Sequence, residues 1–340
     1  MRKILRLIFA LVALCSAAAA NAALLEKPDI VLAVGGKTTL YYLPLTIADR
    51  LGYFKDEGLS VEIQDFPGGA KALQALLGGS ADVVSGAYEH TIVMQTLAQK
   101  VQAFVLQGTN PGLQLGISKA RAAGYSWPRD LKGMRVGVSA PGSSTHMLVN
   151  HLLASVGLTP DDVSIVGVGT GAQAVAAMRS GELDAISNVD PVMMLLEKQG
   201  AIKIVHETVT VQGARAVFGS TLLAGSLYAK MTFVQNHPNT IQALTNAMVR
   251  ALKWLQTATP EQVAQTVPPE FLLGDRELYL DAFKRVRQTY SPDGTISPKA
   301  VLQSYEVLRT HNQAVRRAPV LFLNDTYTNK FVNKALEQYN

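Results

Sequence analysis

The sequence is poor in cysteine, in charge and in long apolar runs, and each shortage excludes a class of protein. Cys15 is the only cysteine. It lies in an N-terminal segment that we expect to be removed, so the mature chain would have neither a disulfide nor a catalytic thiol. Charged residues make up 17% of the 340 residues and hydrophobic residues 48%, which is typical of a folded globular protein. Beyond the first residues, no apolar stretch approaches the roughly 20 residues that cross a bilayer.

The first 22 residues are typical of an export signal. Basic residues near the start precede an apolar run from Leu7 to Leu14, and Ala20-Asn21-Ala22 offers a small-x-small cleavage site. We predict cleavage after Ala22 and a periplasmic location. The alternative is a lipoprotein anchored at Cys15, although the preceding Leu14 is larger than the residue that lipoprotein processing prefers.

Little net charge remains once the signal is removed. The full chain has 31 lysines and arginines against 26 aspartates and glutamates, and three of the basic residues belong to the signal. The rest of the chain has no basic run of the kind that binds nucleic acid or an anionic membrane. We therefore expect no nucleic-acid partner.

Short apolar runs alternate with amphipathic stretches that end in glycine. Strict alternation of strand and helix predicts an α/β protein with parallel sheets covered by helices. The predicted strands are Ile30–Val34, Val61–Ile63, Ala81–Val84, Ala103–Leu106, Arg135–Val138, Val163–Val168, Asp184–Ser187 and Ile202–Val205. The predicted helices between them are Pro44–Glu57, Ala70–Leu77, Ser144–Val156, Ala172–Ser180 and Pro191–Gln199.

An internal repeat indicates two similar lobes. Nine residues between Val61 and Ser85 are identical to the residues 102 positions later, among them Asp82 and its counterpart Asp184. Convergence on a common strand–helix–strand unit is the alternative to duplication, and it predicts the same two lobes.

The alternation of predicted strands and helices ends near Gly213. One more strand is predicted at Val217–Ala224, and the chain then becomes helical. The predicted C-terminal helices are Pro238–Thr257, Pro260–Val267, Asp275–Tyr290, Pro298–His311 and Thr326–Tyr339.

These elements predict two lobes joined by a two-segment hinge. After the signal at 1–22, lobe I would comprise residues 23–112 and 217–340, and lobe II residues 113–216. The chain would cross between them at Thr109–Gly116 and again at Gln212–Gly219.

The loops after the strands are the expected ligand site, because ligands bind beyond the carboxyl ends of parallel strands. The strongest candidate is the loop from Ser139 to Thr145, which opens a helix. Its residues Gly142, Ser143, Ser144 and Thr145 offer backbone N–H groups at a positive helix end and three hydroxyls, which suit a carboxylate, sulfonate or phosphate. The alternative is that a serine only caps its own helix.

Other loops supply further candidates. Tyr41 and Tyr42 could stack on a ligand or plug the core. Glu89 and Asp190 could bind a ligand ammonium group or cap helices. The remaining predicted contacts are Gly86, Ala87, Tyr88 and Asn188.

Signatures of enzymes and of cofactor sites are weak. There is no Gly-x-Ser-x-Gly elbow and no His-Glu-x-x-His pair. Gly167–Ala172 fits the loose dinucleotide pattern, but that pattern arises often in glycine-rich parallel-sheet proteins. Glu89 and His90 are the only acid–base pair near the predicted cleft. We predict a protein that is not an enzyme and has no metal and no cofactor.

Several strings, taken together, resemble the periplasmic substrate-binding proteins of ABC transporters for aliphatic sulfonates, taurine, nitrate and the pyrimidine precursor of thiamine. They fall in order along the chain: Leu51–Leu59 (LGYFKDEGL), Gly78–Val83 (GGSADV), Pro141–His146 (PGSSTH) and Gly181–Ala185 (GELDA), followed by Asp190-Pro191.

The resemblance implies a type II periplasmic-binding-protein fold that closes over a small-molecule solute. It also implies an ABC transporter permease in the inner membrane as partner, and we expect a monomer. Relatives for sulfonates often have an aromatic residue where this chain has Val189, which leaves room for a bulkier carboxylate, aromatic acid or heterocycle. The alternatives are a pyrimidine-binding or pyrimidine-synthesis protein, a secreted enzyme on this scaffold, and the sensing module of a receptor.

Overall fold

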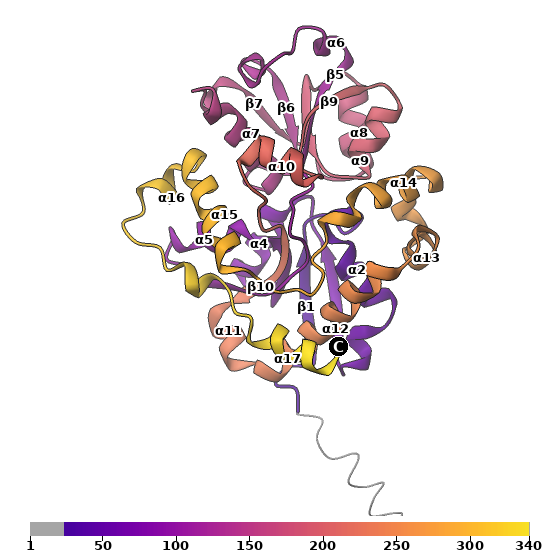
Figure 1. Ribbon diagram of the computed structural model, residues 1–340, viewed down its shortest axis with the longest axis vertical. Helices are drawn as coiled ribbons and strands as arrows, with labels where there is room; N and C mark the ends of the chain where they lie inside the picture. Colours follow the sequence, from indigo (N-terminus) through magenta and orange to yellow (C-terminus); the bar gives the residue numbers. More distant parts are fainter. Residues whose placement is uncertain (1–23, 340) are drawn as a thin grey trace, which may run out of the picture.

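The computed structural model describes residues 24–339, in which two five-stranded sheets are each covered by helices. We call the part around the first sheet lobe I and the part around the second sheet lobe II; they lie one below the other in Figure 1. The predicted signal, its cleavage site and Cys15 lie outside the described residues. No helix of the described part is long and apolar enough to cross a membrane.

The two sheets have the same strand order. In lobe I it is β2 (Ser60–Asp65), β1 (Asp29–Val34), β3 (Val83–Ala87), β10 (Gly225–Lys230) and β4 (Val101–Leu106). In lobe II it is β7 (Ser164–Gly167), β6 (Arg135–Val138), β8 (Ala185–Asn188), β5 (Gln114–Ser118) and β9 (Ile202–Glu207).

The predicted α/β fold with two sheets is confirmed, but both sheets are mixed, because one strand of each is antiparallel to its neighbours. β10 runs antiparallel to β3 and β4, and β5 runs antiparallel to β8 and β9. In each case the antiparallel strand is the one that the chain forms directly after it arrives from the other lobe. An arriving strand enters its sheet from the end that faces the other lobe, and this direction is opposite to that of the parallel strands.

Helices cover both faces of each sheet, which explains why the inner strands are continuous apolar runs. In lobe I they are α2 (Leu43–Arg50), α3 (Tyr53–Asp56), α4 (Gly69–Gly78), α5 (Glu89–Gln95), α11 (Met231–Asn236), α12 (Pro238–Thr257), α13 (Pro260–Thr266), α14 (Arg276–Val286), α15 (Pro298–His311), α16 (Gln313–Arg317) and α17 (Lys330–Gln338). In lobe II they are α6 (Lys119–Ala122), α7 (Ser144–Ser155), α8 (Ala172–Arg179), α9 (Val192–Lys198) and α10 (Val211–Phe218).

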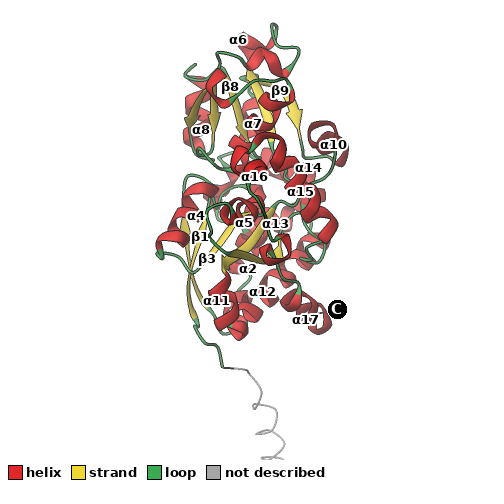
Figure 2. Cartoon of the chain, turned by 90° about the vertical axis from the view of Figure 1, so that its left-hand side faces the viewer, coloured by secondary structure: helices red, strands yellow, loops and turns green. Residues whose placement is uncertain are grey.

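The C-terminal helices do more than cover lobe I. The buried face of α12 contributes Leu244, Met248 and Leu252 to the main core. In contrast, α14, α15 and α16 lie at the level between the two sheets (Figures 1 and 2). α15 packs on α7 of lobe II and on α5 of lobe I. These helices therefore bridge the two lobes.

The predicted strand at Val217–Ala224 is wrong. Helix α10 occupies its beginning, and β10 starts only at Gly225. The hydroxyl of Thr210 accepts a hydrogen bond from the Gly213 N–H at 2.8 Å and begins the helix, and Gly219, with φ of 75°, ends it. The second passage between the sheets therefore lies between β9 and β10 and includes this helix.

The internal repeat has a structural counterpart at the paired aspartates. Asp82 accepts a hydrogen bond from the N–H of Val31 at 3.0 Å, and Asp184 accepts one from the N–H of Arg135 at 3.0 Å. Each aspartate thereby ties the strand that it precedes to the adjacent central strand. The same residue performs the same task in both lobes, as the repeat predicts.

Asp184→Asn should lower the free energy of unfolding by about 1–2 kcal/mol at pH 7. Hydrogen bonds from Arg135 and Arg121 hold the pKa of Asp184 down to about 2, against 3.8 ordinarily. Because that pKa is lowered, the stability it contributes is present above 3.8 and is lost as the pH falls toward 2. Denaturant titrations at pH 7 and pH 3 test this. The exposed Asp161→Asn is the control, and equal losses in both variants would contradict the assignment.

Candidate functional site

The loops at the facing ends of the two sheets meet in the middle of the molecule. The Ala70 N–H donates to the hydroxyl of Ser143 at 3.0 Å, and the Leu40 N–H donates to the carbonyl of Asp190 at 3.0 Å. Gly68 packs so closely on lobe II that a Cβ there would lie 2.8 Å from the Cβ of Ala140. These contacts join loops of lobe I to loops of lobe II.

A small cavity of about 20 Å³ lies between these loops, with room for about one water molecule. Four helix starts surround it, those of α2, α4, α7 and α8, so several positive helix ends point toward one space. Its wall is formed by Gly35, Thr39, Tyr41, Tyr42, Gly69, Leu113, Ser139, Ser143, Ser144, Thr145, Thr170 and Val189.

The start of α7 has both occupied and free polar groups. Thr145 Oγ1 accepts a hydrogen bond from the N–H of Ser139 at 3.0 Å, and Ser143 Oγ accepts one from the N–H of Ala70. The Gly142 N–H donates to Nδ1 of His146 at 2.9 Å. Within the described residues, the N–H groups of Ser144 and Thr145 make no hydrogen bond. Ser144 therefore offers a ligand both its hydroxyl and its N–H group, Thr145 offers its N–H group, and Ser143 keeps the proton of its hydroxyl.

The two tyrosines have different surroundings. Tyr42 is buried in the core of lobe I and meets the ring of Tyr41 edge-on, with 4.7 Å between centroids. The hydroxyl of Tyr41 is buried and makes no hydrogen bond of good geometry among the described residues, although the hydroxyl of Ser144 lies near enough to lower its pKa slightly. Burial raises the pKa of both phenols, and the charge of nearby Glu89 raises it further, so both hydroxyls stay protonated. Tyr41 can thus donate into the cavity.

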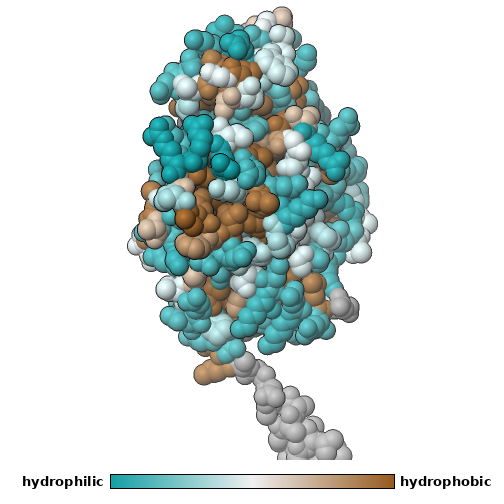
Figure 3. Space-filling view, turned by 60° about the vertical axis from the view of Figure 1, so that its left-hand side comes forward, coloured by the Kyte–Doolittle hydropathy of each residue, from teal (hydrophilic) through white to brown (hydrophobic). Residues whose placement is uncertain are grey.

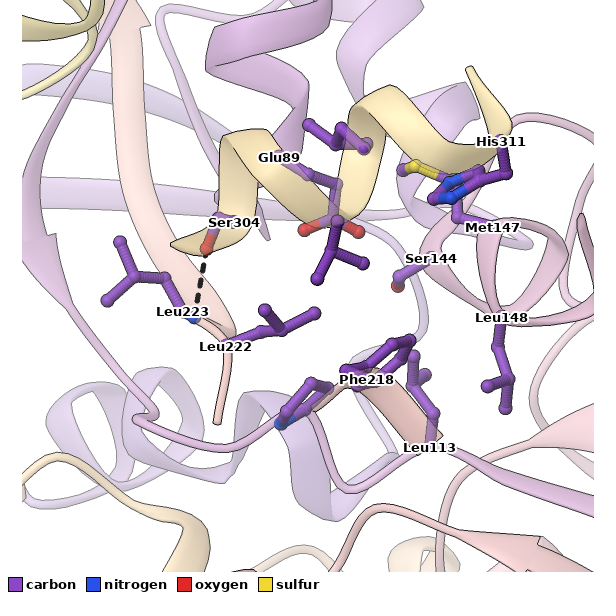
Figure 4. Close-up of a pocket in the computed structure, with 13 residues that line it drawn as sticks. Glu89, Leu113, Ser144, Met147, Leu148, Phe218, Leu222, Leu223, Ser304 and His311 are labelled. Carbon is purple, nitrogen blue, oxygen red and sulfur yellow. Dashed lines mark hydrogen bonds between the residues drawn. The ribbon is translucent and has the colours of Figure 1, made fainter. Parts of the chain in front are cut away.

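Glu89 lies in a second cavity of about 40 Å³, on the other side of Ser144 and Leu113. Figure 4 shows its carboxylate pointing into the space between Ser304, Phe218 and Ser144. Burial raises the pKa of Glu89 from 4.5 to about 7, although part of the side chain is exposed and lines the cavity. A third cavity, of about 10 Å³, has Tyr41, Val189 and Asp190 in its wall. The three cavities share wall residues and form one interlobe region.

Some predicted contacts point elsewhere. Gly86 packs on Tyr228, and Ala87 is buried. Tyr88 points into lobe I, where its hydroxyl contacts that of Thr326 at 2.6 Å. Asn188 is buried and donates to the carbonyl of Gly169 at 3.0 Å. None of these four lines the three cavities, so their role as ligand contacts stays a prediction.

The carboxylate of Asp190, in lobe II, forms an ion pair with an arginine of lobe I. Arg285 on α14 donates to its two oxygens at 2.6 Å and 2.9 Å, and the Met194 N–H donates at 3.0 Å. Arg285 also reaches Gln114 at 3.3 Å and Glu197 at 3.1 Å, both in lobe II. The carboxylate of Asp190 is fully buried in this ion pair, so it is not available to a ligand ammonium group in this structure.

Sequence reasoning missed several residues of this region. Thr39 and Thr170 lie in loops after strands, where the parallel-strand rule places the ligand site, but neither is among the predicted contacts. Gly36 lies against Thr170, and a Cβ there would come within 2.1 Å of its hydroxyl. Arg285 has no signal of its own in the sequence, because it reaches Asp190 from a helix 95 residues away.

Two wider openings lie elsewhere on the described surface. One groove of about 550 Å³ has Arg215 and Lys299 in its wall, and another of about 460 Å³ has Phe218 and Leu302. Figure 3 shows apolar surface at mid-height on the side where α15 and α16 lie. Both grooves are open to solvent, whereas recognition of a small solute favours enclosure. Among the described residues there is no cluster of three or more metal-binding side chains.

The fold is that of the periplasmic binding proteins, as its similarity to solved structures with that fold shows. A protein from Bordetella bronchiseptica RB50 is 48% identical with a TM-score of 0.90, and the match covers 93% of this chain and 99% of that one. The alkanesulfonate-binding protein SsuA from Xanthomonas axonopodis pv. citri, bound to MOPS, is 18% identical with a TM-score of 0.68, over 89% and 99% of the two chains.

Residues 26–267 match the NMT1-like family, and the chain belongs to that family. YtlA of Bacillus subtilis (strain 168), provisionally named a binding protein, is 24% identical over 80% of this chain and 79% of its own length. The 4-amino-5-hydroxymethyl-2-methylpyrimidine phosphate synthase of Schizosaccharomyces pombe is 24% identical over 77% of this chain and 75% of its own length. Relatives of this chain thus include both a binding protein and an enzyme.

Glu89→Gln should stabilise the protein at pH 8 by about 2 kcal/mol and leave it nearly unchanged at pH 5. Because burial raises the pKa of Glu89 to about 7, the stability linked to this group is full below 4.5 and is lost as the pH rises through 7. Glutamine keeps the shape without the charge. Denaturant unfolding at the two pH values measures the difference, with the exposed Glu270→Gln as control. A destabilised Glu89→Gln at pH 8 would contradict this account.

Proposed function

We propose that the protein is the solute-binding component of an ABC importer, located outside the cytoplasm, and that it captures a small organic anion between its lobes by hinge closure. The observation that carries this proposal is the set of free donors around one interlobe cavity: the N–H groups of Ser144 and Thr145, and the hydroxyls of Ser144 and Tyr41. Such donors at a helix start suit a sulfonate or carboxylate. A permease in the inner membrane would receive the solute.

Capture requires the lobes to part and close again. A cavity of about 20 Å³ cannot admit a solute of several heavy atoms, so entry depends on separation of the loops that meet there. Within residues 24–339 the chain passes between the sheets at residues 107–113 and 208–224. Rotation about two such passages is a hinge motion, for which periplasmic binding proteins are the general example. We also propose that residues 112 and 216 mark the boundaries between lobe I and lobe II.

The relatives support binding more than catalysis, and binding needs no reactive side chain. SsuA is described as alkanesulfonate-binding, and YtlA is provisionally described as a binding protein. The predicted export signal, the periplasmic location and the monomeric state are parts of the same proposal.

An enzyme is the second candidate, favoured by the relation to a pyrimidine phosphate synthase. Glu89 and His90 are adjacent on α5, but Nδ1 of His90 contacts the hydroxyl of Tyr228 at 3.0 Å inside lobe I. Burial lowers the pKa of His90 to about 4, so its ring is neutral at pH 7. Conversion of a bound solute, detected by mass spectrometry, would favour the enzyme. Stoichiometric recovery of the unchanged solute supports the binding protein.

Ser144→Ala should weaken binding of an organic anion about tenfold to a hundredfold, the effect of about 1.5–3 kcal/mol for a hydrogen bond to a charged group. A thermal-shift screen of alkanesulfonates, carboxylates and nitrate identifies the solute, and calorimetry measures its affinity. Ser164→Ala, on the exposed edge of β7, is the control. Unchanged affinity in Ser144→Ala would remove this residue from the site.

Gly68→Ala should weaken binding at least tenfold, which corresponds to about 1.4 kcal/mol, because its Cβ would meet Ala140 and oppose closure. Gly78→Ala, at the other end of α4, is the matched control, since its Cβ would meet nothing within 4 Å. Small-angle scattering should show a smaller compaction on addition of the solute to Gly68→Ala than to the control. Equal compaction and affinity in both would argue against closure at this contact.

A further inference from the structure

The sulfur atoms in the described part of the chain all belong to methionine. Of the nine methionines, all but Met1 lie in the described residues, whereas Cys15 lies outside them. Five of these methionine side chains are buried, and those of Met147, Met194 and Met231 are partly exposed. Because an oxidant must reach the sulfur, these three are the candidates for oxidation to the sulfoxide.

Two of the three partly exposed methionines lie where lobe II meets lobe I. Met147 is on α7, on which α15 of lobe I packs, and Met194 is on α9, on which α14 of lobe I packs. Met194 packs against the main core of lobe I and Met147 against the second core of that lobe. Apart from Val209 and Leu223 of the second passage, the members of both cores belong to lobe I.

The third methionine offers an internal comparison. Met231 begins α11, whose neighbours α12, β4 and β10 all belong to lobe I. Its side chain is partly exposed, as are those of Met147 and Met194. Oxidation of Met231 would therefore change lobe I alone, whereas oxidation of the other two would change contacts between the lobes.

Met147 lies in a contact that depends on apolar packing. It lines the mostly apolar cavity around Glu89 together with Leu308 of α15, and Figure 4 shows its side chain extending from α7 toward α15. Among the described residues, the hydrogen bonding between α7 and α15 comes down to one pair, Nδ1 of His151 and the hydroxyl of Thr310 at 3.1 Å. The attraction between these two helices therefore comes largely from apolar contacts.

Oxidation places a polar oxygen in such a contact. When hydrogen peroxide attacks the thioether, its O–O bond breaks and an S–O bond forms. The sulfur is oxidised by two electrons, and the second peroxide oxygen leaves as water. A sulfoxide oxygen that is buried without a hydrogen-bond donor is costly, whereas water solvates it once the lobes part. Oxidation therefore favours the open form over the closed one.

We propose that Met147 and Met194 are oxidation sites that control closure: the lobes close over a solute while both sulfurs are thioethers, and stay apart once they are sulfoxides. This inference rests on the hinge motion of the proposed function and adds a regulation to it. The effect at Met147 should be the larger one. Arg285 of α14 forms an ion pair with Glu197 of α9, whereas no ion pair joins α7 to α15 among the described residues.

The test of the sites requires no solute. The mature protein is treated with hydrogen peroxide, mass spectrometry of its peptides locates the sulfoxides, and small-angle scattering measures the radius of gyration. We expect sulfoxide at Met147 and Met194, a larger radius of gyration, and a return to the original value after treatment with methionine sulfoxide reductases. The double variant Met147→Leu with Met194→Leu keeps the side-chain volume and should not expand.

Met231→Leu is the matched control, and it should expand on oxidation as the wild-type protein does. Met147→Leu alone should suppress more of the expansion than Met194→Leu alone. Absence of sulfoxide at both interlobe sites, oxidation of both without expansion, or equal expansion in the double variant overturns the inference. Loss of the circular-dichroism signal of the helices also overturns it, because the oxidised protein would then be unfolding and not opening.

A failure of this regulation is distinguishable from a failure of capture. The thermal-shift screen of alkanesulfonates, carboxylates and nitrate is repeated on the oxidised and on the reduced protein. We expect the probe with the largest shift to bind the oxidised protein roughly tenfold more weakly, because closure then has to bury the sulfoxides. If that probe binds both forms equally, capture stands and the control by oxidation is overturned.

Discussion

The arrangement of the site depends on the double passage of the chain between the two sheets. β5 forms directly after the first passage and β10 directly after the second, and each becomes the antiparallel fourth strand of its new sheet. Because both sheets are entered from the side that faces the other lobe, the carboxyl ends of their parallel strands, and the helix starts that follow, face the same gap. The positive helix ends around the central cavity are thus a consequence of topology. The side chains then determine which polar groups there lack a partner within the protein.

The sequence predicts those features that depend on local pattern and fails where the decisive contact is distant. Periodicity finds most helices and strands, and the repeat finds Asp82 and Asp184, whose identical hydrogen bonds follow from a shared strand–helix–strand unit. The sequence pattern does not predict β5, because five residues with one glycine are too short to stand out, and its beginning falls within the predicted crossing segment. Residues of the loop from Ser139 to Thr145 line the cavity, as predicted for a ligand loop. Only tertiary packing, however, brings the N–H of Ala70 to the hydroxyl of Ser143 and not to that of Ser144.

Distant contacts also decide which acids are available. Asp190 and Glu89 look alike in the sequence, since each follows a strand and begins a helix. Asp190 is neutralised by Arg285, whose guanidinium fits its two oxygens, and it closes the gap between the lobes. Glu89 meets apolar surface and a neutral histidine, so its charge is left without a partner and its pKa rises. The first carboxylate therefore joins the two lobes, whereas the second lines an interlobe cavity without an ion pair among the described residues.

In the proposed capture cycle, these interlobe contacts also affect the balance between the closed and the open form. Opening must separate Arg285 from Asp190, Lys198 from Asp275 at 2.9 Å, and Ala70 from Ser143. A buried ion pair costs more to break than an exposed one, because each charge loses its partner before water can reach it. Strong contacts favour closure but slow the entry and the release of solute, whereas a ligand shifts the balance only by its preference for one form. In the proposed capture cycle the solute is also released, and this requires an Arg285 ion pair of moderate strength. The partial exposure of Arg285, at 29% of its side chain, would let water solvate the arginine if the lobes part as proposed.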